Sequence, residues 1–472
     1  MTNCCESSNP PHLLIIGGGS AAFSAAIEAH SLGARVTIAN DGLPMGGTCV
    51  NVGCVPSKFL LRAAEAHHLP TSHGFDGIDG KSRLDYRKVV EQKRGLVDDL
   101  QTAKYADIID SLDRVTYRRA KARFKGPNQV VVDGELIKPD RVLVATGASP
   151  AVPPIEGLEE IDYLTNETAF ELETPPESLA VIGGGYVGLE CAQLFSRFGS
   201  EVTVLDHTDI LPSVGDDLSE GLAYYLRNEG IAITESAQIR EVRPEDGKVA
   251  LSVDIDGDEE TIRVEDVLVA AGRRPNMARL HAGEAGIAVD EAGFVETDAS
   301  LETSAEGVFA AGDVIGDPMY VYTAAHEGKL AARNALSDRR ASIDYGPLPW
   351  VVFTDPQVAG VGYDEKQARQ QGMAAESTRL PLSEVPRAVV ARETRGFIKL
   401  VRDRETDRLL GGRILAPEGS ELLMELGVAI RAEMTVEELT DTLHPYLTLS
   451  EGIRLAAMTF ERAVDELSCC AG

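Results

Sequence analysis

The sequence is poor in aromatic side chains, in cysteine and in positive charge, and each shortage excludes a class of protein. Aromatic residues make up 5% of the 472 residues, with 1 tryptophan, and there are 7 cysteines. Lysine and arginine total 45 against 75 aspartates and glutamates, for a formal net charge of −30. Nonspecific binding to nucleic acid or to an anionic membrane needs clustered cations, so this balance argues against both. We interpret the charge as an acidic, solvated surface, with a salty habitat as the alternative.

Long apolar runs are absent as well. No stretch reaches membrane-spanning length, and the opening MTNCCESSNPP lacks the basic and apolar regions of a secretory signal. We therefore expect a cytoplasmic protein, in which a cysteine pair is more often redox-active or metal-binding than a structural disulfide. A chain of this length predicts about two to four domains.

Two segments resemble each other. LLIIGGGSAAFSAAIEAHSLGARVTIAND occupies Leu13–Asp41, and LAVIGGGYVGLECAQLFSRFGSEVTVLDH occupies Leu179–His207. Each predicts an apolar strand, a glycine turn, an amphipathic helix and a second strand, which is a βαβ unit. The small residues of the two turns are Gly17, Gly19 and Ala22 in the first, and Gly183, Gly185 and Gly188 in the second.

These glycine turns have a specific physical use. The first glycine permits a tight turn, the second lets the backbone approach a pyrophosphate, and the third small residue lets helix and strand pack closely. The N-terminus of the helix then offers unpaired N–H groups to the phosphates. Two such turns imply two dinucleotides, so that one chain can pass electrons between two cofactors.

The residues at the ends of the second strands separate the two halves. In the first half, either Asn40 or Asp41 can hydrogen-bond an adenosine ribose. In the second half, Asp206 ends the strand, and no arginine occurs between Arg197 and Arg227. A carboxylate there accepts from a ribose 2′-OH and repels a 2′-phosphate. The sequence therefore favours NADH over NADPH.

Two cysteines lie in the glycine-containing stretch GGTCVNVGCVPSK, Gly46–Lys58. Residues five apart on an ideal helix point about 140° apart, so a bond between Cys49 and Cys54 needs a distorted first turn. Gly53 supplies flexibility, Pro56 suits a helix start, and a helix N-terminus lowers the pKa of a thiol. We interpret the two as a redox-active pair, with a zinc half-site and buried inert thiols as alternatives.

This stretch closely resembles the active-site segment of the flavoprotein disulfide reductases, the family of glutathione reductase and dihydrolipoamide dehydrogenase. The resemblance covers nearly the whole chain and implies that Cys54 lies against a flavin while Cys49 is the interchange thiol. Tyr186 resembles a tyrosine that covers the flavin until nicotinamide arrives. Lys58 and Glu190 resemble a pair of residues that lie beside the flavin.

The resemblance also implies which residues bind FAD, which residues bind the nicotinamide dinucleotide, and how the chain divides into domains. For FAD they are Gly17, Gly19, Ala22, Asn40, Asp41, Gly47, Thr48, Lys58, Ala122, Thr146, Gly147 and Asp313. For the nicotinamide dinucleotide they are Gly183, Gly185, Gly188, Glu190, Asp206 and Gly272. We expect an α/β fold with two Rossmann-like domains, 1–148 with 276–345 for FAD and 149–275 for NAD(P), followed by an α+β dimerisation domain, 346–472, that makes a homodimer.

Two departures from this family point to one of its branches. Where disulfide reductases carry a histidine acid five residues before a glutamate, HPYLTLSEG places Tyr446 before Glu451. A tyrosine, with a pKa near 10, is a poor acid for a thiol leaving group. The chain also ends with Cys469 and Cys470, adjacent thiols that suit a soft metal ion. Together these features resemble the branch of the family that reduces Hg(II).

The expected reaction uses both cysteine pairs. Hg(II), delivered as a thiol complex, would bind Cys469 and Cys470 and pass to Cys49 and Cys54, with Tyr446 and Tyr186 close by. Two alternatives stay open, a disulfide or lipoamide reductase and a flavoprotein that only sequesters mercury.

The other cysteines and the histidine receive separate interpretations. Cys4 and Cys5 are either another mercury pick-up point or part of a disordered tail, and Cys191 is a core residue. We expect His444 to be structural, with a role as substitute acid as the alternative.

Overall fold

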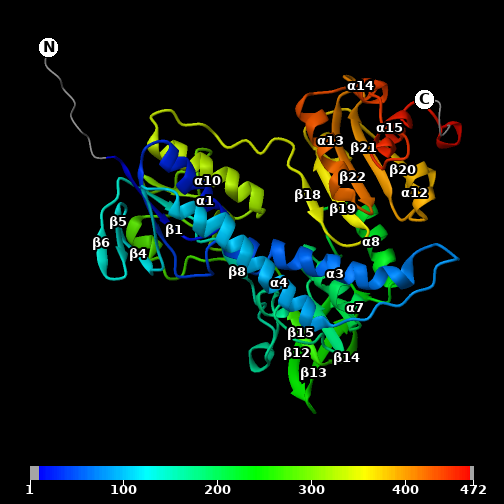
Figure 1. Cartoon of the computed structure of the whole chain (residues 1–472), viewed down its shortest axis with the longest axis horizontal. Helices are drawn as coiled ribbons and strands as arrows, with labels where there is room; N and C mark the ends of the chain where they lie inside the picture. The colour runs from blue at the N-terminus through cyan, green and yellow to red at the C-terminus, as the bar shows by residue number, and fades with distance from the viewer. Residues whose placement is uncertain (1–9, 468–472) are drawn as a thin grey trace. The chain divides into compact units, whose positions relative to one another are not determined.

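The chain passes back and forth between two units, each built from separate segments of the sequence (Figure 1). The computed structural model describes residues 10–467. The first unit contains the chain up to Ser57, Val90–Ala151 and Gly272–Asp344; the second contains Lys58–Val89, Val152–Ala271 and the chain from Tyr345 onward. The division into an FAD-binding, a nicotinamide-binding and an interface domain stays a prediction.

A parallel sheet of five strands forms the centre of the first unit, in the order β17-β7-β1-β2-β3. Its strands are β1 (His12–Ile16), β2 (Arg35–Ala39), β3 (Val115–Arg118), β7 (Arg141–Val144) and β17 (Val308–Ala310). Helix α1 (Ser20–Ser31) connects β1 to β2. The predicted strand, glycine turn, helix and strand of Leu13–Asp41 are therefore confirmed.

Both faces of this sheet are covered. Along β1, Leu13 and Ile15 belong to one buried cluster while Leu14 and Ile16 belong to another. Because both faces of the strand are buried, its sequence is an uninterrupted apolar run and does not alternate between apolar and polar residues. On one face α1 packs beside α10 (Val321–Leu336) so closely that a Cβ on Gly328 would lie 2.1 Å from the carbonyl oxygen of Ala21.

Smaller elements complete the first unit. An antiparallel sheet comprises β4 (Ala122–Gly126), β5 (Gln129–Val132) and β6 (Glu135–Ile137), and β8 (Ala148–Pro150) pairs with β16 (Arg273–Pro275). The helices are α2 (Gly47–Asn51), a π-helix (Thr102–Ala106), α5 (Asp107–Asp110) and α9 (Ala282–Ala285), with a 3₁₀ turn at Asp313–Ile315. Helices α3 (Cys54–Ser72) and α4 (Tyr86–Gln101) each have one end in each unit.

The second unit contains a second parallel sheet, in the order β11-β10-β9-β15. Its strands are β9 (Ser178–Ile182), β10 (Glu201–Leu205), β11 (Ala232–Thr234) and β15 (Asp266–Val269). Helix α7 (Tyr186–Arg197) connects β9 to β10, which confirms the second predicted βαβ unit. Helices α6 (Asn166–Ala169) and α8 (Asp216–Asn228) and an antiparallel sheet of β12 (Ala237–Glu245), β13 (Lys248–Ile255) and β14 (Asp258–Val264) accompany it.

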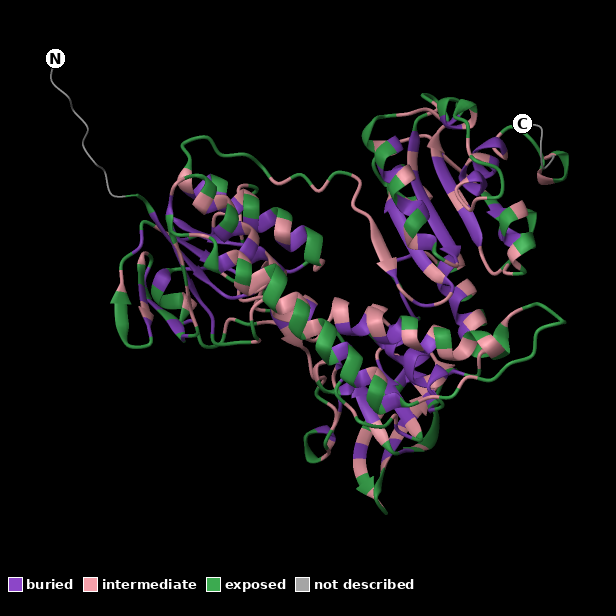
Figure 2. Cartoon of the chain, viewed as in Figure 1, coloured by how far each residue is buried: buried purple, intermediate pink, exposed green. Residues whose placement is uncertain are grey.

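The C-terminal part of this unit is an antiparallel sheet in the order β18-β19-β22-β21-β20 (Figure 1). Its strands are β18 (Trp350–Val352), β19 (Gln357–Gly362), β20 (Ala375–Pro381), β21 (Phe397–Asp403) and β22 (Leu409–Ala416). The helices are α11 (Glu365–Gln370), α12 (Pro386–Ala391), α13 (Gly419–Arg431), α14 (Val436–Asp441) and α15 (Glu451–Met458). Figure 2 shows the strands largely buried and the outward faces of the helices exposed.

The expected fold class, α/β with a C-terminal α+β part, is confirmed by these sheets. Among the helices of residues 10–467, none combines the length and the apolar character that crossing a membrane requires.

A histidine is buried in the first strand of the first sheet. His12 is 4% exposed, and its Nε2 lies 2.9 Å from Oγ1 of Thr37 on β2. Burial lowers the pKa of His12 from 6.5 to about 4; Arg35 adds to the shift and Asp140 opposes it. The folded protein therefore holds this imidazole neutral at a pH where the unfolded chain protonates it.

We predict that this histidine makes the protein less stable in mild acid. Below about pH 6.5 the unfolded state binds a proton that the folded state refuses, so the free energy of unfolding falls as the pH drops towards 4 and is unaffected above 6.5. By about pH 5 the loss is about 1–2 kcal/mol. Urea unfolding of wild type and His12→Gln at about pH 7 and pH 5 measures it; equal slopes in the two proteins would contradict the prediction.

Candidate functional site

The cysteine pair lies where one short helix ends and a long one begins. Cys49 is inside α2, and Cys54 is the first residue of α3. The N–H of Val52 donates to the carbonyl of Thr48 (3.0 Å) and closes α2, while that of Ser57 donates to the carbonyl of Gly53 (3.0 Å) and opens α3. The chain thus breaks between the cysteines instead of distorting one helix. Both cysteines are partly buried.

The segment that carries these cysteines lies directly against the first glycine turn. A Cβ on Gly47 would lie 2.7 Å from Cα of Gly19, and Gly47 has a φ of +61°. The N–H of Gly46 donates to the carbonyl of Gly18 at 2.8 Å. No larger residue can replace Gly47 without moving the two backbones apart.

An asparagine between the cysteines holds α2 in place. The side-chain NH₂ of Asn51 donates to the carbonyls of Pro44 (3.2 Å), Met45 (3.1 Å) and Gly47 (2.8 Å). Its oxygen accepts from the side-chain amide of Gln101 at the end of α4 (3.0 Å). No local sequence pattern indicates this role, because Gln101 comes beside Asn51 only through the tertiary fold.

A tyrosine that the sequence analysis missed also lies beside the pair. Tyr105, in the π-helix, packs edge-on against Phe23 at a ring-centre distance of 4.8 Å. Burial raises the pKa of Tyr105, and the nearby thiols of Cys49 and Cys54 raise it further, while a hydrogen bond with Ser20 opposes them. The hydroxyl therefore stays protonated at neutral pH.

The first glycine turn fits the pyrophosphate of a dinucleotide such as FAD. Gly17 has a φ of +127°, and a Cβ there would lie 2.0 Å from the carbonyl oxygen of Ala145. Gly19 is the N-cap of α1, and Ala22 is fully buried behind it. Thr146 Oγ1 is buried without a hydrogen-bond partner among the described residues, and such an orphaned hydroxyl fits a site that a ligand completes.

A cavity of about 270 Å³ lies at the end of β2, beside this turn. Asn40, which lines it, donates its amide to the carbonyl of Leu43 (2.8 Å) and to the hydroxyl of Tyr117 (2.9 Å). Asp41 is exposed. The structure thus gives Asn40 a part in holding the loop and leaves Asp41 facing solvent. Ala122 packs in the core with Ile16.

An arginine joins several of the predicted FAD residues. Arg273 Nε lies 3.4 Å from Oδ2 of Asp313, and its Nη2 lies 3.5 Å from Oγ1 of Thr48 and donates to the carbonyl of Ala148. Burial raises the pKa of Asp313, and the charge of Arg273 opposes that rise. Gly147, with a φ of +66°, accepts from the N–H of Asn276 (2.9 Å). Sequence reasoning missed Arg273, whose signal was its place directly after Gly272, at the start of β16.

The second glycine turn repeats the geometry of the first in the second unit. A Cβ on Gly188 would lie 1.9 Å from the carbonyl oxygen of Gly183, so the third position here tolerates only glycine. Gly185 is the N-cap of α7, and Tyr186 is its first residue. Asp206 accepts from the N–H of Gly184 at 2.5 Å, so this carboxylate also orders the turn.

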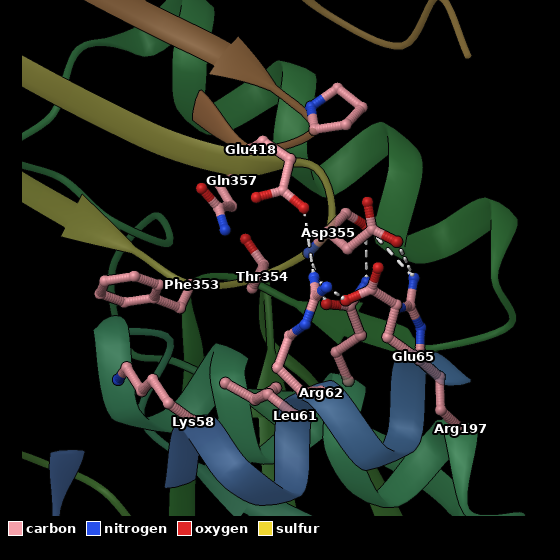
Figure 3. Close-up of a pocket in the computed structure, with 12 residues that line it drawn as sticks. Lys58, Leu61, Arg62, Glu65, Arg197, Phe353, Thr354, Asp355, Gln357 and Glu418 are labelled. Atoms are coloured by element: carbon pink, nitrogen blue, oxygen red, sulfur yellow. Dashed lines mark hydrogen bonds and ion pairs between the residues drawn. The ribbon is translucent and has the colours of Figure 1, made fainter. Parts of the chain in front are cut away.

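A lysine and a glutamate form an ion pair in the second unit. Lys58 Nζ lies 2.7 Å from Oε2 of Glu190, whose other oxygen accepts from the N–H of Phe353 at 3.0 Å. The same ammonium lies 4.6 Å from the centre of the Phe353 ring. Lys58 and Phe353 also line a cavity, and Figure 3 shows them on one side of it, with Arg62, Arg197 and Asp355 toward the other side.

Buried ion pairs hold the far end of α7. Arg197, whose side chain is 5% exposed, donates to Glu229 (2.8 Å) and to Asp355 (2.8 Å). Arg395 also donates to Asp355, at 2.9 Å. These bonds join α7 to the loop before β19, which is the loop that presents Phe353 to Glu190.

The C-terminal histidine and tyrosine have different surroundings. His444, 6% exposed at its side chain, pairs with Glu425 at 2.5 Å and is structural in this arrangement. Tyr446 is 53% exposed. The carboxylate of Glu451 accepts from the N–H of Leu447 (3.1 Å) and so shapes the loop that bears Tyr446. Cys469 and Cys470, like Cys4 and Cys5, lie outside the described residues.

The third described cysteine is a core residue, as expected. Cys191 is 1% exposed, and burial raises its pKa to about 12, with Glu190 adding to the shift and Lys58 opposing it. A thiol held protonated in this way is neither a nucleophile nor a metal ligand. In the part of the chain that the structure describes, no group of three or more His, Cys, Asp or Glu side chains is placed to hold a metal ion.

Two family profiles match the chain. The profile described as pyridine nucleotide-disulphide oxidoreductase matches residues 11–328, and the profile described as its dimerisation domain matches residues 348–457.

Relatives match along almost the whole chain. Curated proteins named mercuric reductase are 41% identical in Staphylococcus aureus, 44% in Acidithiobacillus ferrooxidans and 41% in Streptomyces lividans, each over 98% of this chain. The match covers 84%, 84% and 98% of those proteins. Among solved structures, the HOCl-induced flavoprotein disulfide reductase RclA from Escherichia coli has a TM-score of 0.85 and 28% identity over 94% of this chain and 99% of its own. Its Cu(II) complex has a TM-score of 0.84 and 29% identity over 93% and 98%.

We predict that Asn51 keeps the cysteine segment in its working position. Asn51→Ala leaves three backbone carbonyls without this donor and should lower the free energy of unfolding by about 1–3 kcal/mol. It should also change the alkylation rate of Cys49. Asn51→Asp, which cannot donate, should match the alanine variant, while Gln101→Ala removes fewer bonds and should have a smaller effect. Urea unfolding and mass spectrometry of alkylated peptides measure both; wild-type values in Asn51→Asp would contradict the role.

Proposed function

The chain belongs to the pyridine nucleotide-disulphide oxidoreductase family, and from this premise we propose that it reduces Hg(II) to elemental mercury with electrons from a nicotinamide dinucleotide. The observation that carries the proposal is the contact of Gly47 with Gly19, which sets the Cys49–Cys54 segment against the first glycine turn. The 41–44% identity to curated mercuric reductases supports the substrate. The orphaned Thr146 hydroxyl and the glycine cradle fit FAD at this turn.

The residues then divide the chemistry as follows. The first glycine turn and Thr146 would hold FAD, which would supply two-electron transfer between the nicotinamide and the cysteine pair. Cys49 and Cys54, reduced from a disulfide to two thiols, bind Hg(II) as thiolates and release their protons. Once the pair is reduced, each further NAD(P)H supplies the two electrons that reduce the bound Hg(II), and the two cysteines regain their protons as the metal leaves. In sum, NAD(P)H and Hg(II) give NAD(P)⁺, a proton and Hg(0). Thiolates are the ligands for this soft cation, because oxygen and nitrogen ligands cannot draw it from cellular thiols.

The position of Cys54 favours its thiolate. As the first residue of the 19-residue helix α3, it lies at the positive end of the helix dipole, which lowers the pKa of a thiol. Lys58 lies one turn further along the same helix, and its pairing with Glu190 holds its ammonium in place.

Tyr446 supports a metal ion rather than a disulfide as substrate. Disulfide cleavage needs an acid for the leaving thiolate, and the exposed phenol of a tyrosine is a poorer proton donor than the imidazolium of a histidine. His444 is engaged with Glu425, which argues against a role as the missing acid. We propose that Tyr446 instead lies beside Hg(II) as it passes between cysteine pairs.

We further propose that mercury enters through the C-terminal tail. Cys469 and Cys470 would take Hg(II) from a thiol complex and pass it to Cys49 and Cys54 by stepwise thiol exchange, so that no free ion is required. The match to the dimerisation profile suggests a homodimer. In that dimer, Cys469 and Cys470 of the partner subunit would serve this site. A cytoplasmic location, where such thiol complexes form, belongs to the same proposal.

One assay tests the function against its alternatives. Anaerobic protein receives NADH or NADPH, excess thiol and Hg(II), and volatile mercury is measured; Cys54→Ser should abolish it. Nicotinamide oxidation only with a disulfide substrate would instead indicate a disulfide reductase. If neither reaction takes place, the result would indicate a protein that sequesters mercury without reducing it.

We predict that the tail matters most when mercury arrives bound to thiols. Cys469→Ala/Cys470→Ala should lower kcat/KM for thiol-bound Hg(II) by about tenfold or more, because the tail raises the local concentration of mercury at the inner pair. The matched control is Cys191→Ala, which removes a buried thiol and should leave this rate unchanged. An unchanged rate in the tail variant would remove the tail from the mechanism.

We also propose a preference for NADH, supported by the carboxylate of Asp206 and by the absence of arginine between Arg197 and Arg227. The neighbouring His207, 83% exposed at its side chain, offers a test. His207→Arg adds a donor for a 2′-phosphate and should raise kcat/KM for NADPH about tenfold while leaving that for NADH nearly constant. Steady-state kinetics with each nucleotide measure this, and a wild-type enzyme faster with NADPH would overturn the preference.

A further inference from the structure

The only tryptophan of the chain fills a space left by a glycine. Trp350 on the edge strand β18 pairs across the ladder with Gly360 on β19, which pairs in turn with Arg413 on β22. Directly paired residues point to the same face of a sheet. A Cβ on Gly360 would lie 2.3 Å from Cζ2 of the indole, so the ring occupies the surface above the glycine.

A buried arginine also lies beside the indole ring of Trp350. Arg413 is 4% exposed, and its guanidinium carbon lies 5.7 Å from the centre of the Trp350 ring. Its Nη1 donates to the carbonyls of Val361 (3.0 Å) and Gly412 (2.9 Å), and its Nη2 to that of Gly362 (3.2 Å). The guanidinium is thus bound to the sheet backbone, and a cation in this position attracts the face of the indole.

Trp350 in turn contacts Tyr186. The two ring centres lie 6.2 Å apart with the planes inclined at 44°, within the range in which aromatic pairs attract. Tyr186 begins α7 directly after the second glycine turn, and a dinucleotide that uses this helix N-terminus meets its ring. Three positions further along the chain from Trp350, the N–H of Phe353 donates to Glu190, one helical turn after Tyr186. The segment Trp350–Phe353 therefore braces the first turn of α7 at two points.

We propose that Trp350 is a positioning residue that holds the Tyr186 ring and thereby sets how tightly the nicotinamide dinucleotide binds. This rests on the proposed function, in which that dinucleotide occupies the second glycine turn. Entry of the nicotinamide displaces the Tyr186 ring from its contact with the indole, so the contact opposes binding. Gly360 and Arg413 fix the indole and make the contact firm.

The test is a titration of the FAD-loaded protein with NAD⁺ and with NADP⁺, which bind without transferring electrons. Because Trp350 is the only tryptophan, its emission reports directly on the neighbouring ring. In the wild type the emission should change and saturate with nucleotide, and in Tyr186→Ala most of that change should be lost. An unchanged wild-type emission at saturating nucleotide, with binding verified by calorimetry, would overturn the proposal.

Calorimetry of two variants supplies a second readout. Trp350→Ala should lower the nucleotide Kd about two- to tenfold, the value of an aromatic pair, while Trp350→Phe, which keeps a ring, should stay near the wild type. Arg379→Ala, which removes a cation–π contact with Phe397 on the same sheet, is the matched control and should not change Kd. A wild-type Kd in Trp350→Ala would overturn the proposal. Both measurements work without mercury, so their outcome is independent of whether the protein reduces Hg(II).

Discussion

The close approach of two backbone segments, the first glycine turn and the turn that leads into α2, is the constraint on which the rest of this site depends. A Cβ on Gly47 would lie 2.7 Å from Cα of Gly19, so the approach requires glycine. Through it, the cysteine-bearing helices lie against the place where a pyrophosphate fits. The proposed reaction needs the cysteine pair close to its electron source. The backbone contact brings these two segments together, and Asn51 fixes the orientation of α2.

The chemistry of sulfur explains how the remaining groups are distributed. Two cysteines lie at the junction of α2 and α3, while Cys191 is buried and its pKa is raised to about 12. The fold thus keeps one thiol inert by burial and leaves the other two partly accessible. In the loop before α15, the carboxylate of Glu451 accepts from the N–H of Leu447 and so shapes the backbone that bears Tyr446.

The two glycine turns have the same arrangement of strand, turn and helix, but they differ in which side chain fits at the third small position. In the first turn the third small residue is Ala22, which packs without conflict, whereas in the second turn only Gly188 fits under the carbonyl of Gly183. The second turn is also ordered from outside, by Asp206 at the end of β10. The first turn instead meets a second glycine segment. This difference matches the distinct neighbours of the two sites, a cysteine pair in one and an aromatic ring in the other.

Local sequence was sufficient for several features that depend on neighbours along the chain. The two βαβ units and the core place of Cys191 were predictable, since hydrophobic period and glycine position act over a few residues. A helix start near Pro56 was also expected, but the break between Cys49 and Cys54 was not. Only the tertiary structure joined Asn51 to Gln101, Arg273 to Asp313, and Trp350 to Tyr186. The two residues of each pair are between 40 and 164 positions apart along the chain. Such contacts depend on which strands and helices pack together, and local sequence patterns do not determine that packing.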